Sequence, residues 1–194
     1  GEKALDLLAA SPATARHIAF ELAQYFVADQ PPAALVDRLA ARFQETGGDI
    51  KSTLKALFAS REFRDSTGAK YKSPYRFVLS AARAAGISAD NPKPLLGTMA
   101  RLGQPLYGCM TPDGYRDTEA AWLSPDASLL RINFAKVLAG GNLPIVDGAK
   151  PVEAAPLLTT LGTGLSGKTR AAVAQAQPEL RAALILGSPD LMRR

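Results

Sequence analysis

Apolar residues recur along this chain at the three- and four-residue spacing of helix faces, and no stretch shows the alternation typical of a strand. The first such stripe follows Ser11 and consists of Ala15, Ile18, Ala19, Leu22, Ala23, Phe26 and Val27. Similar stripes lie within residues 35–43, 50–58, 78–82, 95–102 and 129–138. The pattern predicts an all-α protein, an irregular bundle of about eight to ten short helices.

Serine or asparagine precedes proline at several places where a stripe begins or ends. These pairs are Ser11–Pro12, Ser73–Pro74, Asn91–Pro92, Ser124–Pro125 and Ser188–Pro189. The polar side chain can accept hydrogen bonds from N–H groups that lack partners at a helix start, and proline fits the first helical position. Gly47, Gly86 and Gly103 stand where helices are expected to stop. We therefore expect proline-initiated helices with short connections, apart from one long structured loop over residues 103–123.

The length and composition favour one globular domain. A chain of 194 residues, 47% of them hydrophobic, can bury a core without disulfides or metals. We therefore expect a single helical domain over residues 1–194, with flexible glycine-rich segments at 140–150 and 159–167. No apolar run is long enough to predict a membrane span. The net charge of +5 is compatible with anionic partners without requiring them.

The chain has one cysteine and one histidine, so its sequence offers neither a disulfide nor a Cys- or His-based metal site. Residues 162–169, GTGLSGKT, do match the phosphate-binding P-loop pattern at Gly162, Gly167, Lys168 and Thr169. A P-loop follows a hydrophobic strand, but Pro156 interrupts the preceding apolar segment. We interpret the match as false, a glycine-rich turn in which Ser166 caps a short helix. Neither a metal nor a cofactor is expected.

Basic and aromatic residues interleave over residues 61–83. The basic ones are Arg61, Arg64, Lys70, Lys72, Arg76 and Arg83, against the acidic Glu62 and Asp65. Such a patch can bind acidic polymers. The alternative is a solvated loop followed by a helix that buries its aromatic side chains. No nucleic-acid motif accompanies the patch, so no nucleic-acid partner is expected.

Residues 103–135 are the most distinctive part of the chain, with its only tryptophan and its only cysteine. A long loop anchored by aromatic residues is usually functional or else packed by its own side chains. We expect Trp122 to anchor the loop, with its indole N–H bonded to a carbonyl. Asn133 is expected near the apolar stripe of the next helix, where it would tie the loop to that helix.

Acidic residues gather around this loop. Paired carboxylates can act as acid and base or hold Ca²⁺, but their spacing here fits no calcium loop. Asp113 can instead shape a turn with Gly114. No catalytic residue is assigned. The candidate ligand- or partner-binding residues are Gln104, Tyr107, Asp113, Tyr115, Asp117, Glu119, Trp122 and Asn133.

Several segments together resemble the bacterial family called domain of unknown function 1800. They are SPATARHIAFELAQYFV, LKALFASREF, KSPYRFVLSAARAAG, the 103–135 block and RAALILGSPDL, and they span nearly the whole chain in order. The most specific matches are Gly103, Gln104, Pro105, Leu106, Tyr107, Pro112, Gly114, Trp122, Leu123, Pro125, Arg131, Asn133 and Phe134. Two positions depart from the family pattern: Ser11 stands where histidine is usual, and Tyr115 where tryptophan is usual.

The resemblance implies a longer exported parent, periplasmic or secreted, of which this chain is the C-terminal part. Genes of the family often lie beside those of a secreted sulfatase-like family, which implies a protein partner of that kind. The function we expect is a non-catalytic helical domain with a binding or assembly role. One alternative is part of an enzyme for polysaccharide or sulfated substrates, with the 103–122 loop at the cleft. Another is a weak binder of acidic polymers through residues 61–83. The sequence predicts no oligomeric state.

Overall fold

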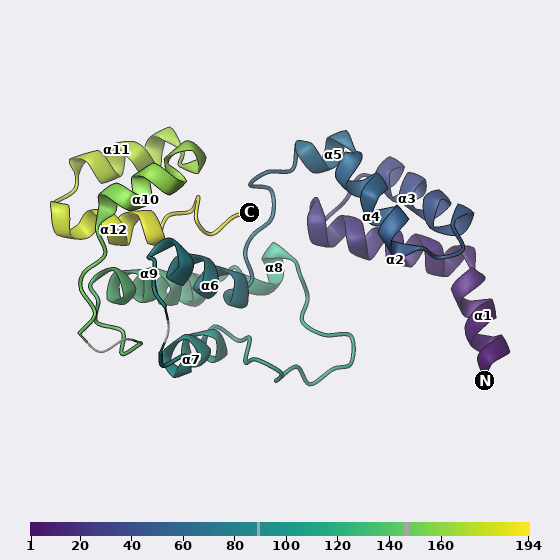
Figure 1. The fold of residues 1–194 in the computed structure, drawn as a ribbon, viewed down its shortest axis with the longest axis horizontal. Coiled ribbons are helices and arrows are strands. Elements are labelled where there is room, and N and C mark those ends of the chain that lie inside the picture. The colour runs from purple at the N-terminus through teal and green to yellow at the C-terminus, as the bar shows by residue number, and fades with distance from the viewer. Residues whose placement is uncertain (89, 146–147) are drawn as a thin grey trace. The chain divides into compact units, whose positions relative to one another are not determined.

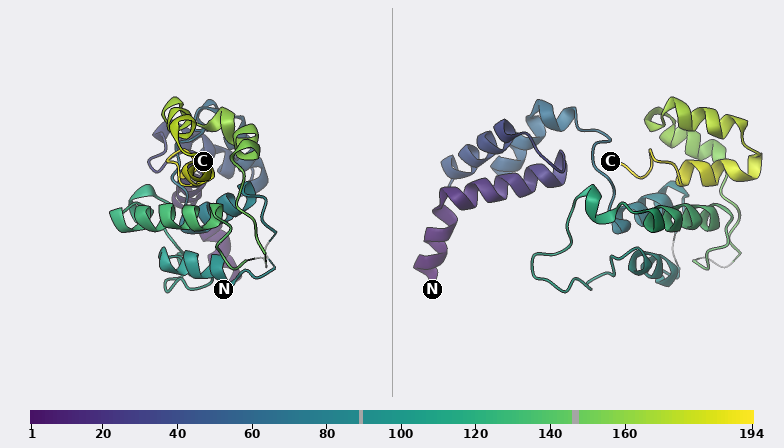
Figure 2. Two further views of the ribbon diagram at one scale, coloured as in Figure 1. Left: turned by 90° about the vertical axis from the view of Figure 1, so that its left-hand side faces the viewer. Right: turned by 180° about the vertical axis from the view of Figure 1, so that it is seen from behind.

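The computed structural model describes residues 1–88, 90–145 and 148–194. Across these residues the regular structure consists of twelve α-helices and one short 3-10 helix, with an isolated bridge between Tyr71 and Arg193 and no sheet (Figures 1 and 2). The predicted all-α class is confirmed. The helix number exceeds the prediction partly because α5 and α8, each of four residues, are too short to show an apolar stripe.

Contacts divide the chain into two compact units, Gly1–Lys70 and Tyr71–Arg194, each described here by itself. The expected single domain over residues 1–194 stays a prediction. The helices of the first unit are α1 (Glu2–Ala10), α2 (Pro12–Phe26), α3 (Ala33–Glu45), α4 (Ile50–Ala59) and α5 (Arg61–Arg64). Helix α3 packs on both α2 and α4, and the buried core between them consists of Ala19, Ala23, Val27, Leu35, Val36, Leu39 and Leu57.

The second unit contains α6 (Pro74–Ala84), α7 (Lys93–Arg101), α8 (Glu119–Trp122), α9 (Pro125–Ala139), α10 (Ala154–Leu161), the 3-10 helix η1 (Gly162–Gly164), α11 (Gly167–Gln175) and α12 (Pro178–Leu186). Helix α12 packs against α9, α10 and α11 (Figure 1). Phe77 of α6 meets Phe134 of α9 edge-on, with ring centroids 6.0 Å apart. These contacts form one continuous apolar core.

Most of the serine–proline and asparagine–proline pairs do begin helices. Ser11 and Ser124 accept hydrogen bonds from the first backbone N–H groups of α2 and α9. Ser73 precedes α6 without a side-chain cap bond, and Asn91 accepts from the N–H of Lys93 at the start of α7. The exception is Ser188, which closes a turn by accepting from the N–H of Leu191.

The glycine-rich segment 159–167, expected to be flexible, is mostly helical: it comprises the end of α10, all of η1 and the first residue of α11. Leu157 and Leu165 are buried on either side of η1, so apolar packing outweighs the weak helix propensity of glycine. Of the other expected flexible segment, 140–150, residues 146–147 lie outside the described residues.

The segment that matches the P-loop pattern follows a helix, α10, and not a strand. Ser166 caps α11 by accepting a hydrogen bond from the N–H of Thr169, as expected. The carboxylate of Asp190 also accepts from the N–H and hydroxyl of Ser166. Although partial burial raises the pKa of Asp190, hydrogen bonds from Thr169 and Ser166 hold it below its usual value. An aspartate thus occupies the helix start where a phosphate would bind.

No helix in the described part of the chain has both the length and the apolarity to cross a bilayer. Nor do the residues in the three described ranges bring three or more His, Cys, Asp or Glu side chains together as a metal site.

The first unit offers a direct test of its core. Leu57 is completely buried, whereas Leu7 on α1 is 75% exposed. Leu57→Ala is expected to lower the free energy of unfolding by about 2–5 kcal/mol, because it removes buried methyl groups and leaves a cavity. Leu7→Ala should change it by less than about 0.5 kcal/mol. Urea unfolding followed by circular dichroism measures both, and equal losses would contradict this core.

Candidate functional site

The long loop from α7 to α8 is fixed at its beginning to two helices (Figure 1). Gly103 leaves α7 with a φ of 90°, in the left-handed region that favours glycine. The backbone N–H of Gln104 donates to the carbonyl of Met99, 2.9 Å away. Its side-chain oxygen accepts from the N–H of Tyr75 in the first turn of α6, at 2.8 Å. Gln104 therefore holds the loop by both its backbone and its amide.

Tyr115 and Trp122 close the other end of the loop. The Tyr115 hydroxyl donates to the carbonyl of Pro105 at 3.0 Å, and the Trp122 indole N–H donates to the carbonyl of Arg116 at 2.8 Å. The two rings lie 5.9 Å apart, and Trp122 is buried. The predicted role of Trp122 as an anchor bonded to a carbonyl is confirmed. Burial also raises the pKa of the Tyr115 hydroxyl, which keeps it a donor at neutral pH.

A pocket of about 290 Å³ opens where the two ends of the loop meet. Its walls include Tyr75, Gln104, Pro105, Tyr107 and Tyr115. Three of the predicted site residues, Gln104, Tyr107 and Tyr115, thus lie around one hollow. The lining is mostly aromatic and apolar with an amide at one side, which is the composition of small binding pockets.

The tip of the loop presents large apolar side chains to solvent. Tyr107 and Met110 are each 98% exposed, and Leu106 is about half exposed. Tyr107 also has a φ of 58°, the only non-glycine residue with positive φ in the described ranges. Left-handed backbone is costly for an aromatic residue, and such outliers persist where the surroundings impose them.

The acidic candidates lie apart from this pocket. Asp117 pairs with Arg194 at 3.0 Å, and Glu119 pairs with Arg193 at 2.5 Å. A side-chain hydrogen bond from Thr111 lowers the pKa of Asp113. The carboxylates therefore hold the loop and the end of the chain in place.

The expectation for Asn133 is wrong. Its side chain is exposed, and it lines a shallow hollow between α7 and α9 beside Thr98 and Arg101. The apolar stripe of α9 runs through Phe134 and Leu138, so Asn133 falls just outside it. On α9 it is Arg131 that binds a distant segment: its guanidinium donates to the carbonyl of Lys72, just before α6, at 2.8 Å.

The basic segment 61–83 is divided between the two units. In the first unit Arg61 pairs with Asp65, and Lys70 lies 2.5 Å from Asp29. In the second unit Phe77 is completely buried, as the alternative interpretation of this segment requires. Lys72 forms no ion pair with a carboxylate among the described residues, and its ammonium group donates to the hydroxyl of Ser80.

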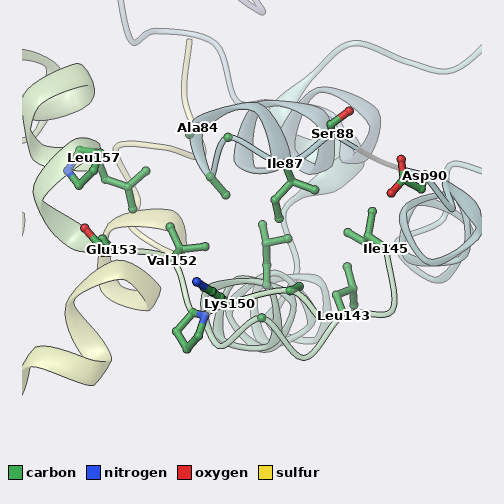
Figure 3. A pocket seen from close by; sticks show the side chains of 17 residues that line it. Ala84, Ile87, Ser88, Asp90, Leu143, Ile145, Lys150, Val152, Glu153 and Leu157 are labelled. Carbon is green, nitrogen blue, oxygen red and sulfur yellow. The ribbon is translucent and has the colours of Figure 1, made fainter. Parts of the chain in front are cut away.

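A second, larger cavity of about 550 Å³ was not predicted. The segment after α6 and the segment between α9 and α10 form its walls. Ser88 and Asp90 lie at one end and Glu153 at the other, with Ile87 and Val152 between them (Figure 3). The interior is apolar and the charged groups are at the rim.

Gly141 allows the backbone at Lys150, in the wall of the cavity, to approach closely. Gly141 has a φ of 69°, and a Cβ there would lie 2.8 Å from the carbonyl carbon and oxygen of Lys150. The N–H of Val152 then donates to the carbonyl of Ala139 at 2.7 Å. The double glycine at 140–141 was interpreted only as part of a flexible segment. The close approach depends on contacts with residues several positions away in the chain.

The strain at Tyr107 can be measured with two variants that remove the same ring. Tyr107→Gly is expected to be about 1 kcal/mol more stable than Tyr107→Ala, because only glycine adopts left-handed backbone without a steric penalty. Thermal and urea unfolding give the difference. Equal stability of the two variants would show that the position is not strained.

Comparison with known proteins agrees with the resemblance in the sequence. The model of the family described as Protein of unknown function (DUF1800) matches residues 1–193. No curated protein and no solved structure matches the chain. The family match includes the loop, the pocket at its base and Arg193, which pairs with Glu119. The chain therefore belongs to the DUF1800 family.

Proposed function

We propose that this chain is a helical binding module and that the tip of its loop, residues 106–110, contacts a protein partner. The observation that carries the proposal is the nearly complete exposure of Tyr107 and Met110 on a loop closed at its base by Tyr115 and Trp122. Tyrosine and methionine are enriched in protein interfaces, and exposed apolar groups gain free energy when a partner covers them.

The fixed base of the loop supports tight binding. A loop already held in one conformation loses little entropy when a partner binds. The hydrogen bonds of Gln104 and Tyr115 hold the base of the loop in one conformation. The pocket beside them, of about 290 Å³, has room for one side chain of the partner. An anchor residue in such a pocket is the usual centre of an interface.

The state of the carboxylates favours binding over acid–base chemistry at the loop. A general acid at neutral pH needs a raised pKa, but the pKa of Asp113 is lowered. Asp117 and Glu119 each accept from an arginine. These two ion pairs stabilise the loop that carries the proposed contact residues.

The partner we propose is a secreted sulfatase-like protein encoded near the parent gene, as the family resemblance implies. The parent is then periplasmic or secreted. An interaction surface of this kind needs no catalytic group in the present chain.

The test measures the affinity of the full-length parent for that protein by calorimetry. Tyr107→Ala combined with Met110→Ala is expected to raise Kd at least about tenfold, the effect of losing roughly 1.4 kcal/mol of binding free energy. Leu129→Ala is the control, since Leu129 is 59% exposed on α9 of the same unit. Unchanged affinity in the loop variant, or no binding by the unaltered parent, would refute the proposal.

A further inference from the structure

The most deeply buried charge of the second unit has unused hydrogen-bond donors. Arg131 has no exposed surface, and its guanidinium carbon lies 4.5 Å from the centre of the Tyr71 ring and 4.9 Å from that of Phe77. One terminal nitrogen donates to the carbonyl of Lys72. Its Nε and Nη1 are buried without an acceptor in the described residues. Buried charged donors normally have partners, because leaving them unpaired is costly.

Lys72, whose backbone carbonyl Arg131 binds, carries a second cation. The ammonium group of Lys72 donates to the hydroxyl of Ser80 at 3.2 Å. Burial, together with the positive charges of Arg131 and Arg194, lowers the pKa of Lys72 to about 8. Unlike Arg131, Lys72 keeps part of its surface open to solvent.

The carboxylates nearby do not neutralise these two cations. Glu119 is 2.5 Å from Arg193, and Asp117 is 3.0 Å from Arg194, so each already pairs with a cation of the chain's last two residues. The N–H of Lys72 donates to the carbonyl of Met192, which brings that segment alongside. Among the described residues, neither carboxylate forms an ion pair with Lys72 or Arg131.

Two like charges in a poorly solvated region repel each other strongly. An anion bound beside Lys72 would offset this repulsion. An ammonium group with free N–H donors is a common ligand for phosphate-like groups.

We infer that Lys72 and Arg131 form the cationic end of a binding site for a small tetrahedral oxyanion, sulfate or phosphate. Lys72 Nζ makes the direct contact, with the Ser80 hydroxyl beside it. Arg131 adds its charge through the low-dielectric interior and fixes the Lys72 backbone. The site is separate from the loop tip proposed to bind a protein.

The affinity for the anion is expected to depend on pH through the charge of Lys72. The anion binds the protonated amine, so bound anion raises the pKa of Lys72, and affinity is full well below pH 8 and lost well above it. The other groups around Lys72 are the guanidiniums of Arg131, Arg193 and Arg194, the carboxylates of Asp117 and Glu119, and the Tyr71 ring against Arg131.

The test compares thermal unfolding in sodium sulfate and sodium chloride at equal ionic strength, at pH 6.5 and 9.5. A saturable rise in Tm with sulfate is expected at pH 6.5 and not at pH 9.5. Sulfate also stabilises proteins non-specifically, but that effect does not saturate and is present in every variant. Lys72→Met is expected to abolish only the saturable part, and the exposed Lys136→Met to retain it.

Chemical labelling gives an independent measure that does not depend on stability. A saturating excess of sulfate should slow acylation of Lys72 about tenfold at ten times Kd, with Lys136 unaffected, as followed by peptide mass spectrometry. Inorganic phosphate should protect equally, and protection by glucose 6-phosphate would show that the site accepts the group on a larger molecule. An equal sulfate response in Lys72→Met, or no protection of Lys72 by either free ion, would overturn the inference.

Discussion

The second unit depends on one guanidinium enclosed by two aromatic rings. Arg131 extends from the middle of α9 and is covered by Tyr71, just before α6, and by Phe77 within it. Its bond to the carbonyl of Lys72 fixes the chain at the point where it enters the unit. Residues 71–72 in turn pair with the last residues of the chain, through the Tyr71–Arg193 bridge and the bond from Lys72 to Met192. Arg131 and residues 71–72 together therefore link the beginning, the middle and the end of the unit.

This arrangement also determines what the long loop can do. Arg193 and Arg194, held beside residues 71–72, pair with Glu119 and Asp117 at the end of the loop. The beginning of the loop is tied to α6 through Gln104. With both ends fixed, the backbone between them can hold Tyr107 in a left-handed conformation and expose its ring. The tip of the loop can remain exposed because the base of the loop is fixed.

Local signals in the sequence predicted the helices and part of the site. Ser11 and Ser124 cap helices because their hydroxyls and the following prolines act within one turn. Trp122 was predicted as an anchor because a large ring with one donor is most stable when buried and bonded. The grouping of Gln104, Tyr107 and Tyr115 around one pocket followed from their membership of one loop, but the pocket itself needs Tyr75 from α6.

Features that depend on distant contacts were not predicted. Arg131 lies among the apolar residues of α9, but nothing in its neighbours along the chain shows that Tyr71 and Phe77 enclose it. Asn133, two residues further on, was expected to tie the long loop to α9, but its side chain is exposed. The helix at 154–161 has few polar residues and is followed by glycines, so its packing against α12 could not be read locally. The larger cavity likewise depends on the close approach of Gly141 and Lys150.

The most direct test of this account is a double-mutant cycle on the full chain, with Arg131→Met, Tyr71→Leu and the combined variant measured by urea unfolding. Methionine and leucine preserve apolar volume, so the cycle isolates the interaction between the guanidinium and the ring. The account predicts a coupling free energy above about 0.5 kcal/mol, as expected for a desolvated cation–ring contact. Effects that add within about 0.3 kcal/mol would contradict the central place given to Arg131.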